Sequence, residues 1–95
     1  MDIISTVKEI ELQGRFDAHE APAFRETVDA ILQQTADLRV GLSKVEFVDS
    51  TALAELVRAM KHCREAGGDL VLVSPSDPVR IILELTKLDA AFTIS

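Results

Sequence analysis

A strand pattern passes directly into a helix pattern at Asp49, and this junction constrains the fold more than any other stretch of the chain. Before the junction, apolar residues alternate with polar ones over residues 38–48, which is typical of an interior β-strand. After it, apolar residues recur every three or four positions over residues 53–60, which is typical of an amphipathic helix. A strand joined to a helix without a linker predicts a βα unit, and such units build parallel sheets.

A similar alternation of apolar and polar residues is found nearer the start of the chain. Ile10 and Leu12 alternate with charged residues, which predicts a half-buried strand that ends near Gly14. The residues before Val7 are expected to be a frayed extension of that strand. A second short extended piece and a loop follow, and Pro22 marks the first turn of an amphipathic helix that packs on one side.

The chain continues in the same way after the junction. Glu55 and most other charged residues of the second helix are expected to face water, and the glycines at 67–68 are expected to end that helix in a left-handed turn. Leu70–Val73 is a continuous apolar run, which predicts a strand covered on both faces. A third helix that starts at Pro78 and a short last strand near Phe92 complete the pattern.

These elements predict one α/β domain over residues 1–95. Their order and short connections imply a sandwich with a mostly parallel sheet of four to five strands, covered by about three to four helices. Hydrophobic residues make up 47% of the chain, which is ample for one core, and no linker-like stretch divides it. The single cysteine, Cys63, falls within a helical pattern and is expected to be a packing residue.

The charge of the chain excludes several classes of partner. Ten basic and sixteen acidic residues give a formal net charge of −6, which opposes binding to nucleic acid or to an anionic membrane surface. The longest apolar runs are about four residues, whereas a membrane-spanning helix needs about 20, so no direct membrane insertion is expected. The first residues lack the basic start of a signal peptide, which predicts a cytoplasmic protein.

The histidines, acidic residues and glycines of the chain do not have the spacing of a known catalytic, metal-binding or phosphate-binding motif. His19 lies in a loop beside Asp17 and Glu20, and the spacing of these three matches no structural metal motif. His62 is expected on the exposed side of the second helix, and nothing pairs either histidine with Ser50. The four glycines form no phosphate-binding loop. We therefore expect no catalytic residues, no metal site, no cofactor and no enzymatic activity.

The junction itself is the remaining polar feature. Ser50 and Thr51 are expected at the start of a helix, where backbone N–H groups and the helix dipole favour a negative group such as phosphate. A simpler interpretation is that Asp49 only caps the helix, because Asp is among the preferred capping residues. The local chemistry of these residues is consistent with both interpretations.

Four stretches resemble one known family in their order and spacing. Residues 14–17, Gly-Arg-Phe-Asp, resemble its Gly-Glu-Leu-Asp loop, and residues 42–53 resemble its Leu-Ser-x-Val-x-Phe-x-Asp-Ser-Ser-Gly-Leu signature. The glycines at 67–68 before an apolar strand and the helical stretch 79–88 also fit. Over residues 7–95 the sequence resembles a STAS domain. That family contains bacterial stand-alone anti-sigma factor antagonists and the cytoplasmic domains of sulfate transporters.

The resemblance implies a partner-switching function. In such members, the Ser directly after the signature Asp is phosphorylated by a serine kinase that doubles as an anti-sigma factor, and a metal-dependent serine/threonine phosphatase removes the phosphate. The matching residue here is Ser50, with Thr51 as a second candidate. The resemblance implies a partner-binding surface that is made of Asp17, His19, Asp49, Ser50, Thr51, Ala52 and Leu53.

The sequence also departs from the family pattern. Ala52 stands where a Gly is usual, Thr51 replaces the second Ser, Gly41 stands where many members have an Asp, and a Gly often occupies the position of Lys87. A second interpretation therefore stays open. In that interpretation the chain is a stand-alone STAS subunit of a transporter or signalling complex, and Ser50 is only a cap or a contact residue.

Overall fold

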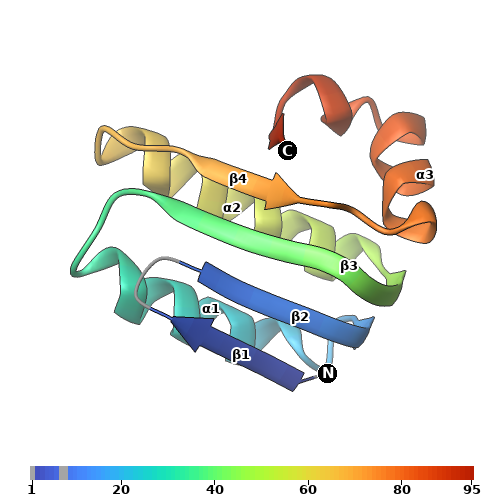
Figure 1. The fold of residues 1–95 in the computed structure, drawn as a ribbon, viewed down its shortest axis with the longest axis horizontal. Helices are drawn as coiled ribbons and strands as arrows, with labels where there is room; N and C mark the ends of the chain where they lie inside the picture. Colours follow the sequence, from blue (N-terminus) through green and yellow to red (C-terminus); the bar gives the residue numbers. More distant parts are fainter. Residues whose placement is uncertain (1, 7–8) are drawn as a thin grey trace.

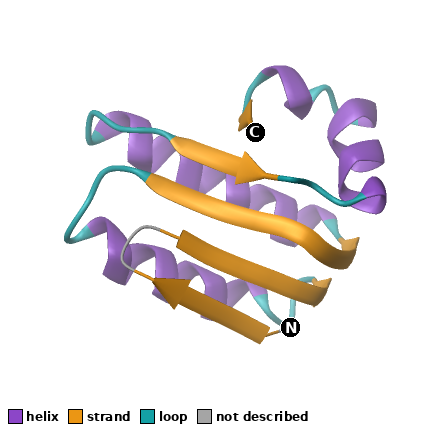
Figure 2. Cartoon of the chain, in the orientation of Figure 1, coloured by secondary structure: helices purple, strands orange, loops and turns teal. Residues whose placement is uncertain are grey.

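The computed structural model describes residues 2–6 and 9–95, in which five strands form one sheet in the order β1-β2-β3-β4-β5 (Figures 1 and 2). Strands β2 to β5 are parallel, and β1 pairs antiparallel with β2. This confirms the predicted α/β fold with a mostly parallel sheet. The elements along the chain are β1 Asp2–Thr6, β2 Glu9–Phe16, α1 Ala21–Leu32, β3 Leu38–Val48, α2 Ser50–Glu65, β4 Leu70–Val73, α3 Asp77–Leu85, the 3-10 helix η1 Leu88–Ala90 and β5 Thr93–Ile94.

The N-terminal part of the sheet differs from the sequence-based expectation. Residues 2–6 form the separate strand β1, which pairs with β2 from Asp2 opposite Gln13 to Thr6 opposite Glu9, so a frayed extension was the wrong prediction. This pairing satisfies backbone groups that a β2 edge would leave open. Val7 lies outside the described residues. Strand β2 also continues past Gly14, whose φ of +79° coincides with a shift in register against β3.

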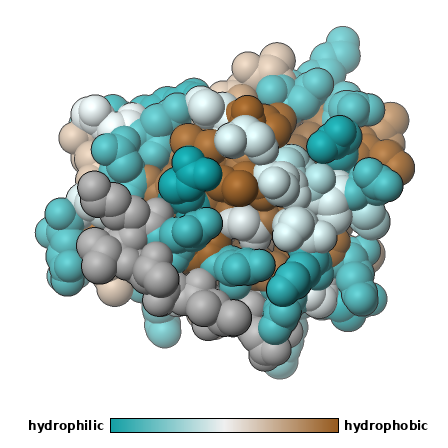
Figure 3. Space-filling model, in the orientation of Figure 1, coloured by the Kyte–Doolittle hydropathy of each residue, from teal (hydrophilic) through white to brown (hydrophobic). Residues whose placement is uncertain are grey.

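Helices α1 and α2 lie on one face of the sheet, behind it in Figure 1. The steps from β2 to β3 and from β3 to β4 go the same way across the sheet, so right-handed crossovers place both helices on the same side. The prediction that Leu70–Val73 is covered on both faces is therefore wrong. Leu70 and Leu72 are buried, whereas Val71 and Val73 point to the other face and are only half-buried. Figure 3 views that face, where apolar surface lies between hydrophilic side chains.

The core between the sheet and the helices is aliphatic and contains two phenylalanines whose rings pack at a tilt of 58°. The rings of Phe16 in β2 and Phe24 in α1 have centroids 4.9 Å apart, and both side chains are fully buried. Cys63 of α2 is buried in the same core, and this burial raises the pKa of its thiol to about 11. Its predicted packing role is confirmed. Helix α2 adds six buried apolar residues, which are Ala52, Leu53, Leu56, Ala59, Met60 and Cys63.

Two helices end in residues with positive φ. Gly67 has a φ of +92° after α2, which confirms the predicted left-handed turn. Lys87 has a φ of +62° after α3, at the position where the family pattern often has Gly. A side chain with a Cβ atom is strained in this conformation.

Replacing Lys87 by Gly is expected to stabilise the fold. Removing the Cβ atom relieves a strain of about 1–2 kcal/mol, and the greater freedom of Gly in the unfolded chain offsets about 0.5–1 kcal/mol of that gain. The free energy of unfolding from urea titration should rise by about 0.5–1 kcal/mol. Lys87→Ala, which removes the same charge but keeps Cβ, is the control and should give no comparable rise. Equal stability of the Gly and Ala variants would show that this strain is absent.

Candidate functional site

Helix α2 begins directly at the carboxyl end of β3, and Asp49 is its N-cap. Asp49 has extended backbone angles, φ −104° and ψ 177°, and its Oδ1 accepts a hydrogen bond from the backbone N–H of Ala52 at 2.8 Å. The buried Val48 before it and the buried Ala52 after it hold this turn against the core. The predicted helix cap is confirmed.

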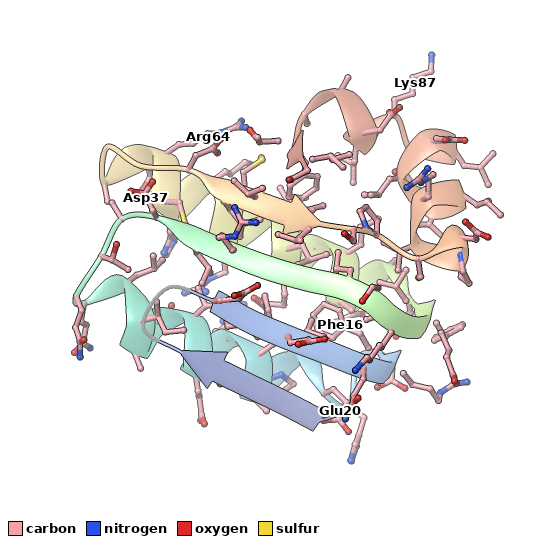
Figure 4. The ribbon with its side chains drawn as sticks, viewed as in Figure 1. Phe16, Glu20, Asp37, Arg64 and Lys87 are labelled. Atoms are coloured by element: carbon pink, nitrogen blue, oxygen red, sulfur yellow. The ribbon has the colours of Figure 1, made fainter. Side chains whose placement is uncertain are left out.

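The second carboxylate oxygen of Asp49 ties α2 to the loop between β2 and α1. Its Oδ2 accepts a hydrogen bond from the backbone N–H of Ala18 at 2.8 Å, and the Asp49 N–H donates to the carbonyl oxygen of Phe16 at 3.3 Å. Phe16 and Glu20, labelled in Figure 4, bound this loop. Two of the four stretches that resemble the family, residues 14–17 and 42–53, therefore adjoin each other at one carboxylate.

The loop is ordered from its other side by Asp17. Its Oδ1 accepts hydrogen bonds from the backbone N–H groups of His19 at 3.1 Å and Glu20 at 3.3 Å. Asp17 thus closes the turn that leads into α1. Its carboxylate is used in this way as a local cap, although the sequence suggested it only as a contact residue.

Hydrogen bonding lowers the pKa of Asp49. The backbone N–H of Ala52 has the largest effect, partial burial acts in the opposite direction, and the N–H groups of Ala18 and Thr51 and the charge of Arg15 lower the pKa further. Asp49 is therefore ionised at neutral pH. A fixed negative charge stands directly before Ser50.

The residues predicted to contact a partner do not all reach the surface. His19, Ser50 and Thr51 are exposed, and Asp17 and Asp49 are half-buried. Ala52 and Leu53, in contrast, are buried against the core, with exposed fractions of 0% and 7%. The first turn of α2 carries them around to the sheet side of the helix, so the surface beside Ser50 does not include their side chains.

Glu55 corrects the predicted orientation of α2. Sequence periodicity placed it in water, but its exposed fraction is only 9%, and the Nε and Nη2 atoms of Arg25 in α1 donate to its carboxylate at 2.6–3.1 Å. This ion pair joins α1 to α2 one turn after Thr51. Periodicity missed it because it depends on a partner thirty residues away. A cleft of about 220 Å³ beside the pair is lined by Ala18, Ala21, Pro22, Arg25, Thr51 and Glu55.

A cation and an aromatic ring also lie at this end of the sheet. The guanidinium of Arg15 in β2 stands 4.2 Å from the ring centroid of Phe47 in β3, and its Nε lies 3.6 Å from the Oδ2 atom of Asp17. Sequence reasoning did not assign a role to Arg15 or Phe47. The register that places these two residues side by side is not visible in local sequence.

Two arrangements that catalysis often uses are absent from the described residues. Within residues 2–6 and 9–95, no group of three His, Cys, Asp or Glu side chains is placed to hold a metal ion. Over the same ranges, no hydrogen bond or ion pair joins His19 or His62 to Ser50. None of the helices in the described ranges is long and apolar enough to cross a bilayer.

Replacing Asp49 by Asn is expected to lower stability in a pH-dependent way. Asn offers one acceptor oxygen where Asp49 uses two, so one backbone N–H loses its partner. The pKa of Asp49 is lowered in the fold, so its stabilisation is present above the ordinary value of 3.8 and is lost as the pH falls through the lower folded value.

Urea titrations of wild type and Asp49→Asn between about pH 3 and pH 7 measure this effect. The difference in the free energy of unfolding should be largest near neutral pH and should shrink in acid. Asp89→Asn, at an exposed position, is the matched control and should leave the pH profile unchanged. A constant difference between wild type and Asp49→Asn across the range would contradict the assigned role of the charge.

Comparison with known proteins connects this geometry to a family. The family model of the STAS domain matches residues 1–95. The anti-sigma-B factor antagonist of Bacillus subtilis is 32% identical over 87 residues, which cover 92% of this chain and 80% of that protein. The anti-sigma-B factor antagonist of Listeria monocytogenes is 33% identical over 81 residues, which cover 84% of this chain and 71% of that protein.

Solved structures show the same fold. A crystal structure from Thermotoga maritima, of a protein provisionally assigned as an anti-sigma factor antagonist, matches 98% of this chain and 83% of its own, with a TM-score of 0.83 at 27% identity. The Bacillus protein SpoIIAA matches in its phosphorylated form over 99% of this chain and 89% of its own, with a TM-score of 0.69 at 19% identity, which shows the fold alone. The chain belongs to the STAS domain family.

Proposed function

We propose that this chain is an anti-sigma factor antagonist that works by partner switching. Unphosphorylated, it binds an anti-sigma factor that is also a serine kinase, and phosphorylation at Ser50 releases that partner. A serine/threonine phosphatase restores the binding form, and the cycle takes place in the cytoplasm. The protein acts as a regulator and not as an enzyme. The names of the relatives from Bacillus and Listeria support this assignment.

The observation that carries the proposal is the position of Ser50. It is exposed, it is the first residue of α2, and it follows a carboxylate that is fixed by two hydrogen bonds. Among the described residues, no hydrogen bond occupies its hydroxyl group. A kinase can therefore reach the hydroxyl without opening the fold.

The same position explains why phosphorylation acts as a switch. A phosphate adds about −1.5 to −2 charges at a helix N-terminus, where the helix dipole tolerates a negative group. The added charge stands directly after the ionised Asp49, at the surface of a chain that is already acidic. A docked partner meets like-charge repulsion and an added desolvation cost, while the fold is kept.

The proposed contact surface is smaller than the sequence suggested. It comprises Asp17, His19, Asp49, Ser50 and Thr51, which are exposed or half-buried around the junction. The cleft beside Thr51 adjoins it and belongs to the same side of the molecule. The side chains of Ala52 and Leu53 support this surface from the core.

Variants of Ser50 test the proposal. The purified protein is incubated with ATP and the anti-sigma factor kinase that a pull-down with this chain recovers, and the phosphate is located by mass spectrometry. Phosphate is expected on Ser50. Ser50→Ala should bind the kinase and stay unmodified, whereas Ser50→Asp should bind at least about tenfold more weakly, a loss of about 1.4 kcal/mol.

Thr51→Ala is the matched control at the neighbouring hydroxyl. It should remain a substrate, because the modified group is Ser50. Phosphate on neither residue, or wild-type affinity of Ser50→Asp, would reject the switch. A transporter component in the pull-down in place of a kinase would favour a structural STAS subunit.

A further inference from the structure

Arg15 is an exposed cation held by two weak contacts at the edge of the proposed site. Its side chain is 64% exposed, its guanidinium stacks on the Phe47 ring at 4.2 Å, and its Nε lies 3.6 Å from the Asp17 carboxylate. Strand register places Arg15 opposite Phe47, two residues before Asp49. The side chain therefore lies at the same end of the sheet as Ser50.

Both contacts of Arg15 are easily exchanged. Exposed ion pairs contribute about 0–1 kcal/mol, and an exposed cation–π contact contributes about 0.5–1 kcal/mol. Two arginines between α1 and α2 are held more firmly: Arg25 donates three hydrogen bonds to Glu55, and Arg58 donates two to Asp29. Arg15 is thus the arginine near the site that is most readily redirected.

The charge of Arg15 already acts on the residue before Ser50. Among the described basic residues, it is the one whose charge lowers the pKa of Asp49. A phosphate carries more charge than a carboxylate and offers oxygen atoms that match the two-pronged guanidinium group. A phosphate is thus a stronger partner for this guanidinium than the Asp17 carboxylate or the Phe47 ring.

We propose that Arg15 binds the phosphoryl group of phosphorylated Ser50 and leaves Phe47 and Asp17 in doing so. This inference rests on the proposed function, because it assumes that Ser50 is phosphorylated and names the residue that binds the phosphate. The consequence is a second change at the surface. The Phe47 ring, already 38% exposed, loses the guanidinium above it, so the modified protein differs in shape as well as in charge.

The test uses protein with phosphoserine incorporated at position 50 during translation, so no kinase is needed. The ³¹P resonance is followed against pH in the parent, in Arg15→Ala, in Arg15→Lys and in Arg39→Ala, which removes an exposed arginine at the other end of β3. The second ionisation of free phosphoserine has its midpoint at about pH 6. A nearby guanidinium favours the dianion and lowers that midpoint.

Arg15→Ala should raise the midpoint by about half a pH unit or more, Arg15→Lys should raise it less, and Arg39→Ala should leave it unchanged. The ring resonances of Phe47 should shift on phosphorylation in the parent and less in Arg15→Ala. Equal midpoints in the Arg15→Ala and Arg39→Ala proteins would overturn the inference. The phosphate is introduced without a kinase, so equal midpoints would reject only the role of Arg15 and not the proposed function. Conversely, if no kinase modified Ser50, the proposed function would fail while this measurement could still be made.

Discussion

The carboxylate of Asp49 is the interaction on which the site depends. One oxygen atom starts α2 through the N–H of Ala52, and the other holds the β2–α1 loop through the N–H of Ala18. Without the first bond the helix loses its N-terminal cap, and without the second the loop loses its side-chain tie to the start of α2. One side chain therefore sets both the position of the hydroxyl group and the surface around it.

The single-sided arrangement of the helices determines where such a site can lie. Because the chain steps in one direction across the sheet, α1 and α2 pack side by side behind the sheet. The start of both helices then falls at the carboxyl ends of these strands. The β2–α1 loop, the start of α2 and the cleft beside the Arg25–Glu55 pair all lie at this edge of the sheet, where α/β folds commonly bind ligands. The opposite face of the sheet is left partly apolar and open.

Sequence patterns predicted the parallel core of this fold because it is governed by local periodicity and caps. The strand that ends at Val48, the Asp49 cap and the turn at Gly67 are each encoded by their immediate neighbours. Strand β1 was not predicted as a separate strand because residues 2–10 contain no Gly, Pro or Asn to divide the sequence pattern. Coverage of both faces of β4 was predicted because crossover direction is not a local property.

The site was only partly predictable for the same reason. The hydroxyl at Ser50 follows from its motif, but the burial of Glu55 depends on Arg25, which is distant in sequence. The stacking of Arg15 on Phe47 depends on strand register. The periodicity of a helix predicts its buried face to within about one residue. Whether a residue at the edge of that face is buried depends on its tertiary partners.

The most direct measurement compares two properties in two forms of the protein. The affinity for the recovered anti-sigma factor kinase and the thermal unfolding midpoint are determined with Ser50 unmodified and with phosphoserine at position 50. Phosphorylation is predicted to weaken binding by at least about tenfold while the unfolding midpoint stays nearly unchanged. Equal affinity of the two forms, or a loss of binding that accompanies unfolding, would contradict this prediction.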